Sequence, residues 1–325
     1  MYVVQYKDEN SRNRVAIYKE RKIYPLTTER NLYQIAFSAI NKKLKIAEAL
    51  NSIPCETPLS PSQLFQSIQF LPPINHSDPS HIIVSGTGLT HINSAMLRKS
   101  MHSNEYLDPA QSIYMNGVNF GKSNETLAKA IPEWFFKGLG HNLKPTNTCL
   151  EIPSYSHGGG EEAEIVAIYL NDADGQPHRI GFALGNEFSD HKLENKNPYY
   201  LAQSKLRDFS IGPEIYLGEF PSEIRGNITV LRNNQSIWRS EFLTGSEHMS
   251  FDIAALEYHA FKHKLLRQPG DINMLFLGAD KLSYNDDLEF MENDFIKIEA
   301  NLFNLPLVNK VKNKEKEFSS VSYSG

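Results

Sequence analysis

The sequence contains little cysteine, and it has no excess of basic residues. Its 325 residues include only two cysteines, Cys55 and Cys149. So few cysteines in a chain of this length do not make a disulfide framework, which is typical of a reducing compartment. The formal net charge is -5 at pH 7, so the chain offers no basic surface to nucleic acid or to an anionic membrane. We therefore expect a small-molecule ligand as its partner.

Long apolar stretches are also missing. No run reaches the roughly 18 apolar residues of a membrane span. The opening stretch, MYVVQYKDENSRNR, lacks the apolar core of a signal peptide. We therefore expect a cytoplasmic protein without a membrane span. With 40% apolar residues, the chain is long enough to bury a full hydrophobic core in one large domain or two.

Proline-rich segments divide the chain. SIPCETPLSPSQ and FLPPINHSDPSH each contain three prolines and read as connections. The chain before them reads as two short strands and a helix over about Thr28 to Leu50. These features predict a small N-terminal α+β domain at 1–78, a larger domain at 79–310 and a polar tail at 311–325.

Most of the larger domain reads as β-strands. EIVAIYL, HRIGFALGNEF, EIYLG, NITVLR, INMLFLG and FIKIEANLF are β-rich segments that turn residues separate. Helices are expected after Thr90, near Tyr199 to Leu206 and from Ser250 to Leu266. Scattered strands with few helices favour an α+β or mainly β fold over a doubly wound sheet.

The segment HGGGEEAEI, residues 157–165, places three glutamates at the start of an apolar strand. Side chains two apart on a strand share a face, so Glu162 and Glu164 converge on one site. Glu187 ends another β-rich segment, and an antiparallel return would bring it to the same point. Carboxylates in such a group suit Mg²⁺, Mn²⁺ or Ca²⁺ and not a soft metal. The alternative is a solvated strand end with unrelated acids.

Two further residues are candidates for proton transfer. Lys205 lies before a Gly-Pro turn, where it is a counter-ion, a substrate anchor or a proton carrier, unless it is an ordinary surface lysine. His91 follows a Gly-x-Gly turn and begins a helix, so it is either a base or a packed cap. Gly86 and Gly88 lack the third glycine of a dinucleotide fingerprint, which excludes a nicotinamide cofactor.

The order of these segments, across about residues 80 to 305, resembles the fumarylacetoacetate hydrolase superfamily. Within it the chain is most similar to the 2-keto-3-deoxy-pentonate (arabinonate) dehydratases. The resemblance implies a mixed β-roll and a homodimer. It also implies a Mg²⁺ site with Glu162, Glu164 and Glu187 as ligands and Lys205 as the family's lysine. SEHMSFDIAALEYHAFKHKLLRQPGDINMLFLGA matches the family's later helix, its Pro-Gly-Asp turn and the following glycine loop.

Departures from the family pattern concern the residues that activate water for hydrolysis. His91 matches the family's histidine, but Ser94 stands where its glutamate would be. The family's arginine, two residues after a Ser/Thr–Ala pair, is replaced around His191, and Ala279 replaces the threonine of its Gly-Thr-Pro loop. Ser189, His191 and Ala279 are therefore the expected substrate-binding positions. The glycines before Glu161 are expected to form a tight turn, with Glu161 facing away from the site.

The resemblance therefore implies Mg²⁺-dependent dehydration of a 2-keto-3-deoxy sugar acid through a metal-stabilised enolate. A pentonate would give 2,5-dioxopentanoate, and Mn²⁺ could replace Mg²⁺. Lys205 is the first candidate for acid/base work at C3, with His91 or a bound water as second choice. The alternatives are a hydrolase that splits the C–C bond of a 2,4-diketo (acylpyruvate-type) acid to give pyruvate, an oxaloacetate-type decarboxylase, and a non-catalytic binding protein.

Overall fold

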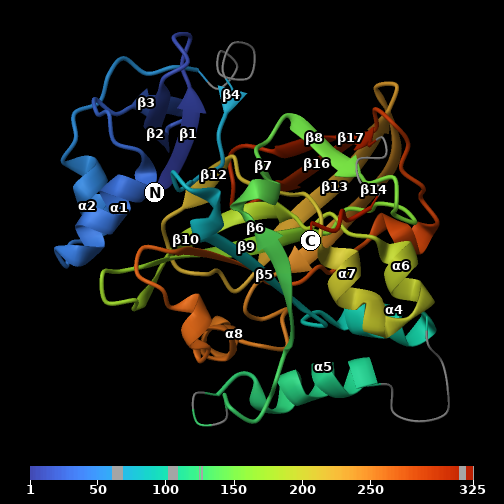
Figure 1. The fold of residues 1–325 in the computed structure, drawn as a ribbon. Coiled ribbons are helices and arrows are strands. Elements are labelled where there is room, and N and C mark those ends of the chain that lie inside the picture. The colour runs from blue at the N-terminus through green and yellow to red at the C-terminus, as the bar shows by residue number, and fades with distance from the viewer. Residues whose placement is uncertain (61–68, 102–108, 124, 126, 315–319, 325) are drawn as a thin grey trace.

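The protein is built from two β-sheets with short helices on their outer surfaces (Figure 1). This computed structural model describes residues 1–60, 69–101, 109–123, 125, 127–314 and 320–324, without the side chains of 97–101. Both sheets contain mainly antiparallel pairs, and parallel pairs join β15 to β5, β11 to β7 and β17 to β8. The predicted mixed α+β fold is confirmed.

The larger sheet has 12 strands and includes the strands that carry the conspicuous acids. Its main path runs β3-β2-β1-β12-β10-β9-β15-β5-β6, and β4, β7 and β11 pair beside that path. The strands are β1 (Tyr2–Lys7), β2 (Asn13–Lys19), β3 (Lys22–Pro25), β4 (Gln69–Phe70), β5 (Ile82–Gly88), β6 (Glu133–Leu139), β7 (Leu143–Lys144), β9 (Ala163–Asn171), β10 (Pro177–Asn186), β11 (Phe209–Ile211), β12 (Glu214–Tyr216) and β15 (Ile272–Phe276).

The second sheet has five strands in the order β14-β13-β16-β17-β8. Its strands are β8 (Thr148–Ile152), β13 (Ile224–Arg232), β14 (Gln235–Thr244), β16 (Phe295–Ala300) and β17 (Leu307–Asn313). The helices are α1 (Leu32–Asn41), α2 (Ile46–Asn51), α4 (Ile92–Met101), α5 (Pro109–Phe120), α6 (His191–Lys196), α7 (Leu201–Lys205) and α8 (Ile253–Phe261). No helix in the described part of the chain is long and apolar enough to cross a membrane.

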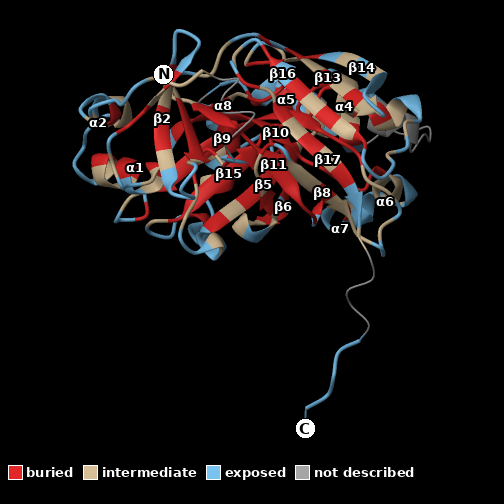
Figure 2. Cartoon of the chain, turned by 90° about the horizontal axis from the view of Figure 1, so that it is seen from above, coloured by how far each residue is buried: buried red, intermediate tan, exposed pale blue. Residues whose placement is uncertain are grey.

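Strand β9 is the centre of the protein, and every one of its residues is buried (Figure 2). Ile165, Ala167 and Tyr169 belong to one hydrophobic core, while Val166 and Ile168 belong to another on the opposite face. Because successive strand residues point to opposite faces, a strand between two cores must be apolar throughout. This explains the uninterrupted run that follows the glutamates in the sequence.

The N-terminal strands join the same sheet as the rest of the chain. Strand β1 pairs with β12, with Tyr2 opposite Tyr216. Strands on both sides of the predicted boundary at residue 78 therefore share one hydrogen-bonded sheet, and the division into domains stays a prediction. At the other end, β17 continues to Asn313, while residues 315–319 and 325 of the predicted tail lie outside the described residues.

The prediction of one helix from Thr28 to Leu50 is wrong. Helix α1 begins after Asn31, whose side chain caps it, and it is followed by α2 after a break. Lys43 lies in that break with a φ of 58°, a left-handed conformation that an α-helix does not contain. The third predicted helix is also shorter than expected, because α8 ends at Phe261 and a separate turn covers Lys264–Leu266.

Candidate active site

The pairing of β9 with β10 brings the three predicted acids together. Glu162 immediately precedes β9, Glu164 is its second residue, and Gly185 of β10 lies opposite Glu164. The Glu187 amide then donates a hydrogen bond to the Glu162 carbonyl oxygen, at 2.9 Å. A two-residue spacing on one strand and an antiparallel return therefore place all three side chains at one point, as the sequence predicts.

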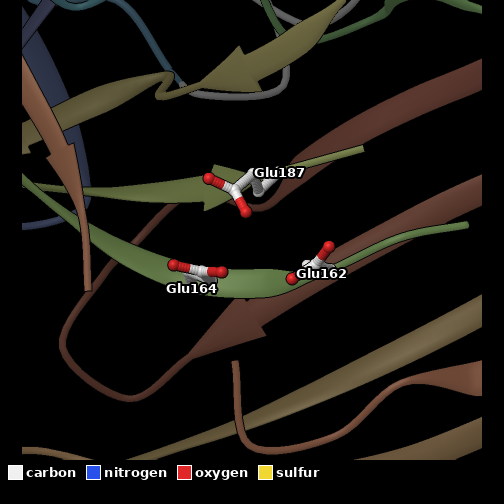
Figure 3. A group of neighbouring side chains, drawn as sticks. All are labelled: Glu162, Glu164 and Glu187. Atoms are coloured by element: carbon white, nitrogen blue, oxygen red, sulfur yellow. The ribbon is translucent and has the colours of Figure 1, made fainter. Parts of the chain in front are cut away.

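The three carboxylates form a compact and buried cluster (Figure 3). One carboxylate oxygen of each residue lies within 4.8 Å of the others. Glu162, Glu164 and Glu187 are 7%, 2% and 1% exposed. The alternative of a solvated strand end is thereby excluded, because these acids are inside the protein, where unpaired charge is costly.

Lys205 is the cation that lies against this cluster. It is the last residue of α7 and is 3% exposed. Its Nζ donates hydrogen bonds to Glu162 and, at 2.9 Å, to Oε2 of Glu187. The ammonium also lies 4.9 Å from the ring centroid of Phe135, a cation–π distance. The surface-lysine alternative is therefore excluded.

The electrostatics show that one lysine is not enough for three acids. Burial, together with the charges of Glu187 and Glu162, raises the pKa of Glu164 well above its usual value. Burial and Glu162 likewise raise the pKa of Glu187 to about 7, against the effect of Lys205. Burial also opposes ionisation of Glu162, but Lys205 and His191 outweigh it and hold its pKa below the usual range. The positive charge of Lys205 thus stabilises the ionised form of Glu162, while the ionised forms of Glu164 and Glu187 remain unfavourable.

The cluster fits a divalent cation in charge and in donor type. Three carboxylates carry three negative charges and Lys205 one positive charge, so two positive charges would make the group neutral. Within the described residues, Oε1 of Glu187 is buried without a hydrogen-bond partner. Hard cations such as Mg²⁺ take oxygen ligands of this kind. Glu162, Glu164 and Glu187 are therefore the residues that would hold the metal.

Glycines around the cluster allow its close packing. A Cβ at Gly160 would lie 2.3 Å from Nδ1 of His191, and one at Gly159 would lie 2.5 Å from the Phe188 ring. Residues 158–160 form no turn, and Gly160 forms a β-bridge with Ser189, so the expected tight turn is wrong, and the two glycines instead leave room for these rings. Glu161 faces away as expected, because its carboxylate accepts hydrogen bonds from the amide and hydroxyl of Ser283.

Several of the expected residues line a cavity together with the cluster. Ser94, His191 and Ala279 lie in its wall with Lys205 and the three acids. His191 begins α6, and its Nε2 lies 3.1 Å from Oε1 of Glu162. Ser94 turns its hydroxyl to the His91 carbonyl oxygen, at 2.8 Å.

The structure does not bring His91 or Ser189 into the cavity wall. Nε2 of His91 lies 2.9 Å from the hydroxyl of Thr244, and Nδ1 lies 3.0 Å from that of Thr90. Burial lowers the pKa of this histidine to about 4. The geometry favours the packed residue over the base. The Ser189 hydroxyl is also buried and donates to the Glu187 carbonyl oxygen, at 2.7 Å.

Strand β6 carries the residues that sequence reasoning missed. Glu133 and Phe135 line the cavity, and Lys137 is fully buried on the same face, with its Nζ 2.6 Å from the Phe188 carbonyl oxygen. Trp134 and Phe136, on the other face, are 40% and 41% exposed. The inward face therefore mixes two charged residues with Phe135, while Trp134 and Phe136 point outward, so the usual alternation of apolar inward and polar outward residues gives no signal for this strand. Helix α6 adds Glu194 to the cavity wall.

Comparisons with known proteins agree with this architecture. No model of a protein family matches the sequence. A probable 2-keto-3-deoxyxylonate dehydratase of Haloferax volcanii is 29% identical over 112 residues, which span 33% of this chain and 37% of that protein.

Solved structures resemble the chain over its whole length. The apo form of 2-keto-3-deoxy-D-arabinonate dehydratase has a TM-score of 0.72 at 16% identity, covering 97% of this chain and 100% of that one. The same enzyme in complex with magnesium and 2,5-dioxopentanoate has a TM-score of 0.71 at 17% identity and the same coverage. A 5-carboxymethyl-2-hydroxymuconate delta-isomerase from Mycobacterium smegmatis has a TM-score of 0.59 at 14% identity, again with 97% and 100% coverage. The chain therefore has the fold of these solved structures, which is the fold that the resemblance implied.

Proposed function

We propose that the protein is a Mg²⁺-dependent dehydratase of a 2-keto-3-deoxy sugar acid, with a pentonate as substrate and 2,5-dioxopentanoate as product. The observation that carries this proposal is the buried cluster of Glu162, Glu164 and Glu187, which has one lysine as its counter-ion and opens into a cavity. The dehydratases that share this fold, one of them in complex with magnesium and 2,5-dioxopentanoate, support the choice of reaction.

The three glutamates would hold the cation at the end of the cavity. A divalent cation bound there supplies a positive centre that polarises the carbonyl group of a 2-oxo acid and acidifies the protons at C3. Because the carboxylates and Lys205 are buried, their charges act in a medium of low dielectric constant, where electrostatic effects are strong. The protein thus provides a rigid and largely dry environment for the reaction.

Lys205 is our candidate for proton transfer. Dehydration removes a proton from C3 and a hydroxyl group from C4, and the two leave as one water molecule. The unsaturated acid that remains becomes 2,5-dioxopentanoate by tautomerisation, in which a proton moves from C5 to C3 and the C5 hydroxyl proton moves to C4. A single group that takes the C3 proton and returns it to the departing hydroxyl completes the balance.

Nζ of Lys205 faces the cluster as an ammonium, so it must first pass one proton to a neighbouring carboxylate, that of Glu162 or Glu187, to which it donates hydrogen bonds, and then acts as the neutral amine. Dehydration therefore requires no residue that activates a separate water molecule. We assign no part in proton transfer to His91, since both ring nitrogens are next to threonine hydroxyls.

The test is a product assay by mass spectrometry. The protein is incubated with Mg²⁺ and 2-keto-3-deoxypentonate, beside a 2,4-diketo acid as the substrate of the alternative C–C hydrolase and oxaloacetate for the decarboxylase. Loss of one water from the first compound, abolished by EDTA, is the expected result. Pyruvate from either of the other two, without dehydration of the first, would overturn the proposal.

We also propose that the protein works as a homodimer in the cytoplasm and that Mn²⁺ can replace Mg²⁺. The dimer is implied by the resemblance to the superfamily, and the exchange of metals follows because both ions take similar oxygen ligands. Sedimentation of the full chain at micromolar concentration would show a single dimeric species. A monomer at every concentration would contradict the proposed assembly without affecting the reaction.

A further inference from the structure

Two side chains contact the same oxygen of Glu162. Nζ of Lys205 donates a hydrogen bond to Oε1, and Nε2 of His191 lies 3.1 Å from this oxygen. An ionised carboxylate only accepts hydrogen bonds, so Nε2 of His191 is the donor of this second bond. Neither contact uses Oε2, so Glu162 can give its other oxygen to a cation at the cluster.

The His191 ring is oriented by this contact with Glu162. Nδ1 of the ring is buried and has no hydrogen-bond partner among the described residues. A Cβ at Gly160 would lie 2.3 Å from Nδ1, so the glycine leaves the space that this side of the ring occupies. Nε2 therefore makes the one hydrogen bond that the described residues give to the ring. Because buried polar atoms are normally paired, the bond to Glu162 is the polar interaction that decides how the ring lies.

An aromatic neighbour fixes the remaining freedom of the ring. The centroid of the Tyr284 ring lies 5.4 Å from that of His191. The Tyr284 hydroxyl accepts a hydrogen bond from the side chain of Asn195, at 3.0 Å. His191 and Asn195 both belong to α6, so the helix holds the histidine and the tyrosine beside each other.

A buried ion pair connects the start of α6 with the end of α7. Asp190 precedes His191, and its Oδ2 lies 3.1 Å from Nη2 of Arg207, with both side chains buried. The Asp190 amide also donates a hydrogen bond to the Ser204 carbonyl oxygen, at 3.0 Å. The Arg207 amide donates to the Lys205 carbonyl oxygen, at 3.0 Å. His191 and Lys205 thus belong to two helices that this ion pair holds together.

A second donor to Glu162 is needed because Lys205 has another task in the proposed reaction. Its Nζ passes one proton to a carboxylate and then takes the proton of C3, so its own hydrogen bond to Glu162 changes during turnover. The contact of His191 takes no part in that transfer. Partners of metal-binding side chains set the orientation of these side chains and contribute to metal affinity. His191 can therefore keep Glu162 in place while Lys205 acts.

We propose that His191 is a positioning residue for the metal, which holds Oε1 of Glu162 so that Oε2 is presented to the cation. This inference rests on the proposed function, because it assumes that a divalent cation binds at Glu162, Glu164 and Glu187. It adds that the geometry of the metal site depends on a donor outside the three ligands and the lysine.

The test compares two amide side chains in place of His191. The side-chain nitrogen of glutamine reaches the position of Nε2 of histidine, whereas that of asparagine reaches only the position of Nδ1. His191→Gln therefore keeps a donor to Glu162, and His191→Asn loses it. Mg²⁺ affinity of the full chain is measured by calorimetry. We expect His191→Asn to bind Mg²⁺ about 10- to 100-fold more weakly than the wild type, and His191→Gln to stay within about threefold of it, since one donor replaces another.

The matched control is a second histidine that contacts a carboxylate. Nε2 of His178, in β10, lies 2.9 Å from Oδ2 of Asp172, and neither residue lines the cavity. His178→Asn should therefore leave Mg²⁺ affinity unchanged. Urea unfolding in EDTA shows whether each variant folds.

His191→Phe provides a second route if His191→Asn does not fold. It keeps a ring beside Tyr284 but has no donor, so it should also bind Mg²⁺ about 10- to 100-fold more weakly than the wild type. A folded variant without the donor that binds Mg²⁺ as tightly as the wild type would overturn the inference. Equal losses in His191→Asn and His191→Gln would overturn it as well, since the position of the donor would then not matter.

Turnover distinguishes this inference from the proposed function. If Mg²⁺ affinity follows the expected order but 2-keto-3-deoxypentonate is not dehydrated, the reaction assignment fails and the role of His191 stands. If dehydration occurs and His191→Asn binds Mg²⁺ as tightly as the wild type, the reverse is true.

Discussion

Buried glutamates occur in this protein in two different environments. Glu214, in β12, is 1% exposed, and its carboxylate accepts hydrogen bonds from the amide and side chain of Asn304 and the amide of Leu305. The cluster of Glu162, Glu164 and Glu187 is also buried, but in the described part of the chain it has one directly paired lysine for three carboxylates, and one of its oxygens has no hydrogen-bond partner. Hydrogen bonds from Asn304 and Leu305 satisfy the Glu214 carboxylate. Among the described residues, the cluster of three carboxylates lacks an equivalent set of positive or donor partners.

The difference teaches that burial alone does not identify a metal site. Burial raises the pKa of Glu214 to about 7 even though three N–H groups point at it. At the cluster, burial acts together with repulsion between carboxylates, which only a cation or protons can relieve. An incomplete set of partners therefore separates a binding site from a structural acid.

The largest expected effect comes from removing a ligand of the cluster. Glu164→Gln should lower dehydratase activity by at least about 100-fold, since even partners of a metal ligand contribute 10- to 100-fold to affinity or activity. The free energy of unfolding without metal should not fall, because the change removes repulsion with Glu187. Steady-state kinetics and urea unfolding check both expectations. Full activity in this variant would contradict the metal assignment.

Removing the lysine should affect stability as well as activity. Lys205→Met leaves Glu162 and Glu187 without their buried counter-ion, and breaking such a pair costs about 3–5 kcal/mol. Urea unfolding in EDTA would measure the loss. Lys297→Met is the control, because Lys297 of β16 is only partly buried and pairs with a surface glutamate, Glu299. A variant as stable as the control would show that the cluster is protonated and needs no cation.

Metal binding should stabilise the protein and displace protons. Mg²⁺ at 100 times its dissociation constant should add about 2.7 kcal/mol to the free energy of unfolding. Because the pKa of Glu187 is raised to about 7 and that of Glu164 is also raised, both must lose protons to bind metal. Mg²⁺ affinity should therefore rise with pH up to about 7. Calorimetry in buffers of different ionisation enthalpy would detect the released protons, and none would be released if these acids were already ionised.

The smallest expected effect on stability is that of Glu214, whose carboxylate accepts hydrogen bonds from Asn304 and Leu305. The pKa of Glu214 is about 7 in the folded protein and about 4.3 when unfolded, so the folded state binds more protons between these values. Its contribution to stability is full below about pH 4.3 and is lost as the pH rises to about 7, by up to roughly 3 kcal/mol. Glu214→Gln should make this part of the stability curve flatter while Mg²⁺ binding stays unchanged. A curve identical to that of the wild type would contradict the raised pKa.

Local spacing was enough to predict the cluster but not the cavity around it. Glu162 and Glu164 share a face because strand side chains alternate, and Glu187 follows from an antiparallel return. Glu133 and Lys137 gave no such signal, because β6 turns these charged residues inward and turns two of its aromatic residues, Trp134 and Phe136, outward. His191 was found only as a departure from the family pattern, since α6 is too short for its periodicity to be recognised.

Contacts between segments that are distant in the sequence also explain the errors in the predicted fold. The apolar spacing from Thr28 to Leu50 fits one helix, but Lys43 adopts a left-handed conformation that only the tertiary packing of α1 and α2 determines. The position of His91 likewise depends on Thr244, which is 153 residues away in the sequence. Contacts between distant segments decide both cases, and a single sequence does not contain them in readable form.

The most direct test of the account is a titration with Mn²⁺ followed by electron paramagnetic resonance. The spectrum of free Mn²⁺ reports how many ions the chain binds, and Mn²⁺ accepts the same oxygen ligands as Mg²⁺. We predict one tightly bound ion per chain in the wild type and in Glu214→Gln, and none in Glu187→Gln. Binding in Glu187→Gln equal to that of the wild type, or no binding in the wild type, would contradict the claim that the incomplete cluster is a metal site.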